Sequence, residues 1–144
     1  MAINTVVVNA TPDRVWEVLR DPSTYPRWVV GAKQYRGADP VFPAVGSRFH
    51  HTVGFGPVTL DDHTEVTDLN PPWRIELRAK TRPLGTARVA ILVQPRDAGT
   101  THLTLIEEAG DTLTRLVFNP LTHALVWGRN IEGLRRLKAI IESS

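Results

Sequence analysis

The stretch from Ser47 to Glu108 alternates between strand-like segments and short turn sequences, and this spacing constrains the fold more than any other feature. Glycine, proline, asparagine and aspartate mark turns at residues 54–57, 70–72, 82–85 and 95–99. The segments between these turns are too close together for the crossover helices that parallel strands require. We therefore expect an antiparallel meander.

The region before the meander predicts one strand and two short helices. Residues 3–9 are short, β-branched and apolar, which is typical of a strand. Thr11 can cap a helix that has Pro12 at its first position and that ends near Asp21. A second short helix is predicted within residues 23–30.

The last quarter of the chain, residues 119–142, predicts one long amphipathic helix. Asn119 can cap it, and Pro120 fits its first position. At about 100° per residue, a single arc holds His123, Trp127, Asn130, Ile131, Leu134 and Ile141, whereas Arg129, Glu132, Arg135 and Arg136 fall outside it. A helix that only covered the core would be expected to have an apolar stripe without polar residues. Because His123 and Asn130 interrupt the stripe here, we expect the helix to face a ligand cavity.

The first hairpin of the meander gives the buried face of the sheet. With a tight turn at Phe55-Gly56, three pairs of residues face each other: Val53 with Val58, His51 with Leu60, and Phe49 with Asp62. The apolar face, which must be the buried one, also carries His51, Asp62 and Thr64. The opposite face holds Arg48, His50 and Glu65 and is expected to be solvated.

His51 and Asp62 are diagonal neighbours on this inner face. A carboxylate can orient an imidazole and raise its pKa, which suits proton transfer. We therefore predict His51 and Asp62 as the catalytic residues if the protein is an enzyme. The alternative is a buried polar pair that satisfies itself, because structural pairs also perturb pKa values.

The inward side chains of the sheet and of the long helix are the candidate ligand contacts. They are Phe55 at a hairpin tip, Thr64, Leu77, Val89, Ile91, Leu103, Leu105 and Glu107 from the sheet, and His123, Trp127, Asn130, Ile131 and Leu134 from the helix. Leu60 and Trp73 are also expected to point inward. Glu107 would act as a buried base or bind a cationic ligand group, or else bond a backbone N–H or an arginine near the rim.

Composition excludes several classes of function. With 144 residues, the chain is expected to form a single domain spanning residues 1–144. Its net charge is only +2 and its basic residues are scattered without interleaved aromatic groups, which argues against nucleic-acid binding. Without cysteine, the chain has no thiolate nucleophile and no sulfur-ligated metal.

No cofactor or metal is expected either, because no phosphate-cradling glycine loop, nucleophile elbow or convincing ligand cluster is present. The first residues lack the pattern of a signal peptide, and no apolar run approaches the roughly 20 residues that span a bilayer. A cytoplasmic location without a membrane span is the resulting expectation.

Three segments resemble the polyketide cyclase/dehydrase and lipid-transport superfamily (START-like, SRPBCC). They are the opening ATPDRVWEVLRDPSTYPRW at residues 10–28, the strand and turn EVTDLNPP at residues 65–72, and GTTHLT at residues 99–104. The resemblance implies an α+β helix-grip fold, in which a curved antiparallel sheet of about seven strands wraps around a long C-terminal helix. Two short helices follow the first strand in this fold.

The resemblance leaves three functions open, since its motifs are turn, cap and packing residues. The first is binding of a small, largely apolar molecule, such as a lipid, polyketide or quinone, between the sheet and the C-terminal helix. The second is a polyketide cyclase, aromatase or dehydratase that uses proton transfer in that cavity. The third is a protein-interaction module of the chaperone-activator type.

Overall fold

The computed structural model describes residues 1–30, 32–55, 57–80, 86–109 and 120–143. Their order along the chain is β1 (Ala2–Val8), α1 (Pro12–Leu19), the short 3-10 helix η1 (Pro22–Thr24), α2 (Tyr25–Trp28), β2 (Ala32–Ala38), β3 (Arg48–Phe55), β4 (Val58–Asn70), β5 (Arg74–Lys80), β6 (Thr86–Asp97), β7 (Thr100–Ala109) and α4 (Pro120–Glu142). Asn119, the expected cap of the long helix, and the turn at residues 82–85 lie outside the described residues.

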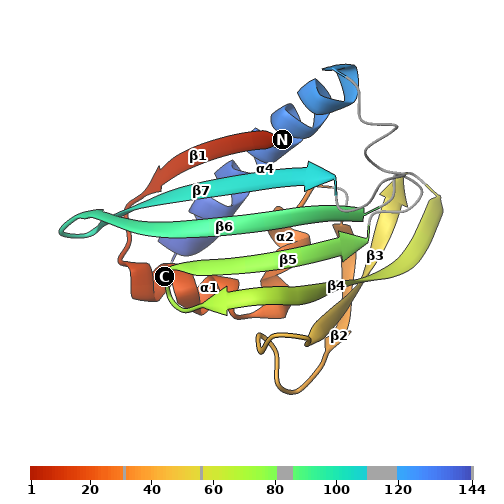
Figure 1. Ribbon diagram of the computed structural model, residues 1–144, viewed down its shortest axis with the longest axis horizontal. Helices are drawn as coiled ribbons and strands as arrows, with labels where there is room; N and C mark the ends of the chain where they lie inside the picture. Colours follow the sequence, from red (N-terminus) through yellow and green to blue (C-terminus); the bar gives the residue numbers. More distant parts are fainter. Residues whose placement is uncertain (31, 56, 81–85, 110–119, 144) are drawn as a thin grey trace.

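The seven strands form one antiparallel sheet in the order β1-β7-β6-β5-β4-β3-β2. Figure 1 shows the sheet in front of α1, α2 and α4, so that the helices lie on one of its faces. The outer face carries cross-strand ion pairs, including Arg48 with Glu65 at 3.0 Å and Arg88 with Glu108 at 3.4 Å. The predicted α+β helix-grip fold is therefore confirmed.

The short helices follow from their capping residues. Thr11 accepts a hydrogen bond from the Arg14 backbone N–H at the start of α1, and Val15, Val18 and Leu19 bury its apolar side. The second predicted helix is divided into η1 and α2. Asp21 caps η1 by accepting from the Ser23 N–H at 3.0 Å.

The sequence pattern did not single out β2, because that strand is polar and irregular. Its pairing with β3 shifts register twice, and Gly37 has a φ of 121°, which only glycine adopts easily. Such interruptions remove the strict alternation by which a strand is recognised in a sequence.

The predicted register of the first hairpin is wrong by two residues. In the structure Phe55 pairs with Val58, Val53 with Leu60, His51 with Asp62 and Phe49 with Thr64. The reason is that the chain turns one residue later than expected, after Phe55. Because side chains alternate with a period of two, this shift keeps every residue on its predicted face. It also brings His51 directly opposite Asp62 rather than diagonal to it.

Only part of the predicted apolar stripe of α4 is buried. Trp127 and Ile131 are 48% and 46% exposed, so their predicted burial is wrong. The buried positions are Asn130, Gly133, Leu134, Leu137 and Ile141. Ile131 lies about 100° around the helix from Asn130, and Figure 1 shows the first turns of α4, before this buried stripe, extending beyond the edge strand β1.

Two further residues predicted to point inward are more exposed than expected. Trp73, at 45% exposure, lies in the turn that precedes β5 rather than within the strand. Leu60 is 37% exposed and lies close to the β3–β4 turn. The remaining inward row is confirmed as buried for Leu77, Ile91 and Leu103.

Polar bonds tie the C-terminal half of α4 to the first elements of the chain. The Lys138 ammonium donates to the Val7 carbonyl at 3.0 Å, and the Asn9 backbone N–H donates to Glu142 at 2.7 Å. The Arg14 guanidinium donates to the Ile141 carbonyl at 3.0 Å, where helix carbonyls lack intrahelical partners. Within the described ranges, none of the helices combines the length and apolarity that crossing a membrane would require.

α2 and α4 pack tightly against each other at Gly133. A Cβ atom at this position would lie 3.1 Å from the backbone carbonyl oxygen of Trp28, which is tighter than an ordinary contact. A Cβ atom at Gly128, one and a half turns earlier, would meet nothing within 4 Å. The two glycines of one helix therefore have different roles, and only Gly133 sets the packing distance.

We expect Gly128→Ala to raise the free energy of unfolding by about 0.5–1 kcal/mol, because alanine is the better helix former. Gly133→Ala should lack this gain and destabilise the protein, since the Trp28 carbonyl would have to move. Urea unfolding of both variants measures the difference, and equal stabilisation by the two substitutions would contradict this account of the α2–α4 contact.

Candidate functional site

Two groups of polar side chains interrupt the mainly apolar inner side of the sheet. The histidine cluster consists of His51 and Thr64 with Asp62, on β3 and β4. The arginine cluster consists of Asn4 on β1, Glu107 on β7, and Arg129 and Asn130 on α4. In the register of the sheet, Val89 on β6 and Leu77 on β5 continue the row of Glu107 towards β4, and further inward apolar residues lie along the same strands: Ile91, Leu103 and Leu105.

The histidine cluster is held by one cross-strand pair and one hydrogen bond. His51, Asp62 and Thr64 are only 4%, 6% and 4% exposed. The Nε2 atom of His51 lies 2.9 Å from the Thr64 hydroxyl oxygen, and Asp62 is the register partner of His51. The Nδ1 atom of His51 is buried and has no hydrogen-bond partner among the described residues.

The electrostatic surroundings keep His51 neutral near pH 7. Burial lowers the pKa of His51 below its ordinary value of 6.5, and this effect outweighs the opposing influence of the Asp62 carboxylate. His63 and His50 lower the pKa further. A neutral imidazole has one donor and one acceptor nitrogen. Its Nδ1 is the acceptor if Nε2–H donates to Thr64, and the donor if the Thr64 hydroxyl donates to Nε2.

The arginine cluster joins α4 to the sheet. Nη2 of Arg129 donates to both carboxylate oxygens of Glu107, at 2.8 and 2.6 Å, and Asn130 donates to the same carboxylate at 3.3 Å. Asn4 donates to the backbone carbonyl of Trp127 at 3.2 Å, while its own Oδ1 is buried without a partner among the described residues. Glu107 thus binds an arginine, as one of the sequence alternatives proposed.

Arg129 and Asn4 were not among the candidates from the sequence. Arg129 was assigned to the solvated side of the helix, but its side chain is only 28% exposed and reaches Glu107. The signal for Asn4 was a polar residue in the inward register of a short apolar strand. The signal for Arg129 was the presence of a buried carboxylate that needs a cation.

The other predicted contacts are placed as follows. Leu134 is buried at 2% exposure in the core cluster that also contains Trp28 and Val15. Val89 is partly buried against the same core. The side chains of Phe55 and His123 lie outside the described part of the structure. Whether any of these residues contacts a ligand stays a prediction.

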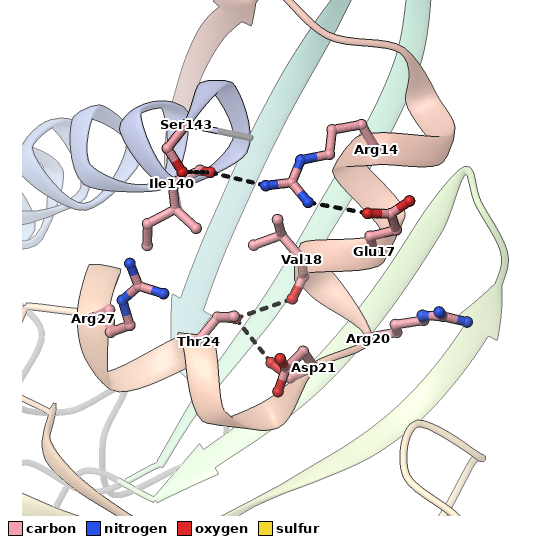
Figure 2. Close-up of a pocket in the computed structure, with 9 residues that line it drawn as sticks. All are labelled: Arg14, Glu17, Val18, Arg20, Asp21, Thr24, Arg27, Ile140 and Ser143. Atoms are coloured by element: carbon pink, nitrogen blue, oxygen red, sulfur yellow. Dashed lines mark hydrogen bonds and ion pairs between the residues drawn. The ribbon is translucent and has the colours of Figure 1, made fainter.

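A surface groove of about 360 Å³ lies elsewhere, between α1, η1, α2 and the end of α4. Figure 2 shows it with Arg14 and Arg27 on the side of Ile140, and Arg20 pointing away. Arg14 is engaged by Glu17 and the Ile140 carbonyl, and Asp21 by Ser23. None of the predicted site residues lines this groove, so it is separate from the inner face of the sheet.

A metal site requires several ligating side chains arranged around one ion. The described ranges contain no group of three or more histidine, cysteine, aspartate or glutamate side chains arranged to hold an ion. His50 and His63 face each other on the outer side of the sheet with ring centroids 6.3 Å apart, on the face that was expected to be solvated.

Comparison with known proteins relates the whole chain to one family. A sequence model of the family described as polyketide cyclase / dehydrase and lipid transport matches residues 3–142. None of the curated protein sequences compared with the chain matches it significantly.

Solved structures share the fold at low sequence identity. A conserved protein from Geobacillus kaustophilus is 18% identical, with a TM-score of 0.72 over 99% of this chain and 95% of its own. A protein from Arthrobacter aurescens is 16% identical, with a TM-score of 0.74 over 99% and 86% of the two chains. The di-domain ARO/CYC BexL from the BE-7585A biosynthetic pathway is 17% identical, with a TM-score of 0.74 over 98% of this chain and 46% of its own. At these identities the likeness concerns the fold alone.

The lowered pKa of His51 makes stability depend on pH. The unfolded chain binds a proton more readily at this residue than the folded protein does. The contribution of His51 to the free energy of unfolding is therefore complete above about pH 6.5 and is lost as the pH falls towards the folded-state pKa. The pKa of His63 is also lowered and acts in the same direction. We expect His51→Gln to reduce the difference in unfolding free energy between pH 7.5 and pH 5.5. An NMR titration of the His51 ring should have its midpoint below 6.5, and a higher midpoint would contradict the assignment.

Proposed function

The chain belongs to the polyketide cyclase/dehydrase and lipid-transport family, and we propose that it binds a small, largely apolar molecule between the inner face of the sheet and α4. The observation that carries the proposal is the buried Nδ1 atom of His51, which has no partner among the described residues and lies on a mainly apolar face.

An unpaired buried polar atom is costly. Leaving such a group unsatisfied costs about 1–3 kcal/mol, and natural proteins rarely accept this without a functional reason. A bound molecule that offers a hydrogen-bonding group to Nδ1 would remove the cost. His51 is then the group that orients the ligand, in the manner of the few polar contacts of a mostly hydrophobic binding site.

The apolar residues beside the histidine cluster would supply most of the binding energy. Leu77, Ile91 and Leu105 come from three adjacent strands and face the same side of the sheet. Burial of apolar ligand surface is worth roughly 25 cal/mol per Å² before the cost of association is subtracted. A ligand that is mainly hydrocarbon, with few polar atoms, suits this surface.

Binding can be tested on the purified protein. Native mass spectrometry should detect a retained small molecule. Titration with 2-ethylnaphthalene should shift the backbone amide resonances of Leu77, Ile91 and Leu105 more than those of the outward-facing Arg48 and Glu65. Shifts limited to the outer face, or none with this probe and no retained molecule, would refute the proposal.

A matched pair of variants on β6 tests whether the ligand binds on the inner face of the sheet. Val89 points inward and its neighbour Ala90 points to the opposite side of the sheet. Val89→Phe should weaken binding of the probe at least about tenfold, because the added ring occupies ligand volume. Ala90→Phe adds the same ring on the other face, with a larger increase in side-chain volume, and should leave the affinity nearly unchanged.

A cyclase or dehydratase is the second candidate function. It is supported by the neutral His51 opposite the Asp62 carboxylate, and by the likeness to BexL, which is described as a di-domain ARO/CYC. The imidazole would take a proton from the carbon between two carbonyls of a poly-β-carbonyl chain. The resulting enolate would attack a ketone carbon of the same chain, and the alkoxide formed would take the proton back. The imidazole would then take a second proton from the carbon next to the new hydroxyl and return it to that hydroxyl, which leaves as water while the C=C double bond forms.

If this chemistry occurs, His51→Ala should lower the turnover of a poly-β-carbonyl thioester about 10²- to 10⁴-fold, the range for loss of a general base. Asp62→Asn should lower it less, because the carboxylate acts through the imidazole. Ring closure with loss of one water is followed by mass spectrometry. Unchanged turnover in both variants would leave ligand binding as the function.

A further inference from the structure

The arginine cluster contains N–H donors that make no hydrogen bond within the described part of the chain. Arg129 offers five N–H groups in a rigid plane, and the two on Nη2 serve the two oxygens of Glu107. The three N–H groups on Nε and Nη1 make no hydrogen bond among the described residues. Because the guanidinium is planar, the Nε–H and one Nη1–H run parallel to the two N–H groups on Nη2, and the second Nη1–H points away from them.

Glu107 and Asn130 hold this guanidinium in place. Glu107 is 7% exposed at its side chain, and Asn130, which is also buried, donates to the same carboxylate. The side chain of Arg129 is itself 28% exposed, so the guanidinium is not fully enclosed by protein. An arginine fixed by a buried carboxylate with its outer donors free is preorganised to receive an oxygen acceptor.

Asn4, beside the cluster, has a buried acceptor of its own, which an N–H or O–H group of a ligand could pair. It is 5% exposed, and its Oδ1 has no partner among the described residues. Asn4 pairs with Leu105 while Ala2 pairs with Glu107, so Asn4 and Glu107 are diagonal neighbours at about 7–8 Å. Free donors and an unpartnered acceptor therefore occur together at one end of the inner face.

The formal charge of the cluster distinguishes between classes of acceptor. Glu107 balances Arg129, so the cluster has no net formal charge. A carboxylate or phosphate placed here would leave an uncompensated negative charge in a largely desolvated region, which is costly. A neutral carbonyl oxygen accepts the same N–H groups without this cost.

We propose that Arg129, positioned by Glu107, binds a neutral carbonyl oxygen of the ligand at the end of the inner face opposite the histidine cluster. This inference rests on the proposed binding function and adds the chemical class of the ligand. The ligand is then an apolar molecule with polar groups at two separated points, one directed to His51 and the other, a ketone, ester or amide, directed to Arg129.

Three naphthalenes of similar size test the inference with the full chain. These are 2-acetylnaphthalene with a neutral carbonyl, 2-ethylnaphthalene without one, and 2-naphthoate with a full charge. The acetyl compound should bind about tenfold more tightly than the ethyl compound, as expected for a hydrogen bond from a charged donor. The naphthoate should bind less tightly than the acetyl compound.

Arg129→Gln should remove the preference for the acetyl compound and leave the affinity for the ethyl compound unchanged. Arg135→Gln is the matched control, because Arg135 lies on the same helix, is paired with Glu132 at 2.6 Å and is exposed. It should keep the tenfold preference. If Arg129→Gln is unstable because Glu107 loses its cation, the double variant Glu107→Gln/Arg129→Gln replaces it.

The outcomes separate this inference from the function on which it rests. A purely structural Arg129–Glu107 pair would alter stability but not the ratio of the two affinities. A tenfold preference that persists in Arg129→Gln, or tighter binding of naphthoate than of the acetyl compound, would overturn the inference while leaving ligand binding intact. Absence of binding by all three compounds would overturn both.

Discussion

The helices lie on only one face of the sheet, and the rest of the structure follows from this constraint. Every strand must place apolar side chains on the covered face and polar ones on the other, because burial of an unpaired polar group is costly. The outer face obeys the rule with its cross-strand pairs of arginine and glutamate. Against this background, the buried polar side chains on the inner side are the departures that need an explanation.

These departures fall into two groups with different electrostatic character. The histidine cluster is governed by desolvation, which keeps the imidazole of His51 neutral beside a carboxylate. The arginine cluster is governed by charge pairing, since Arg129 and Glu107 compensate each other. One group comes from β3 and β4 and the other from β1, β7 and α4. A single elongated molecule that reached both would be held at two points with apolar contact between them.

Much of this arrangement follows from the sequence, because period-two alternation is a strong signal wherever one face is buried. It placed His51, Asp62 and Thr64 on the inner face even though the register was wrong by two residues. The turn position that fixes register depends on local backbone geometry around residues 55–58, which composition does not specify.

The helix was less predictable, because a helical wheel gives relative angles but not which side meets the sheet. Trp127 and Ile131 share the predicted arc yet are exposed, while Arg129 outside it bonds a buried carboxylate. The large apolar surface of Trp127 favours its burial. Which residues of α4 are buried is decided, however, by the positions at which α2 and β1 contact the helix. Long-range ion pairs such as Arg129 with Glu107 join residues 22 positions apart and have no local sequence signature.

The bonds between the end of α4 and the first elements bear on how the fold assembles. The hydrogen bond from Asn9 to Glu142 spans 133 positions, and that from Lys138 to Val7 spans 131. Contacts of such separation carry a large loop-closure entropy before any favourable energy is gained, and they slow folding. The antiparallel hairpins close much shorter loops and can form first. Docking of α4 onto β1 and α1 is then the step that completes the fold, and the part of the inner face that α4 covers stays open to solvent until it occurs.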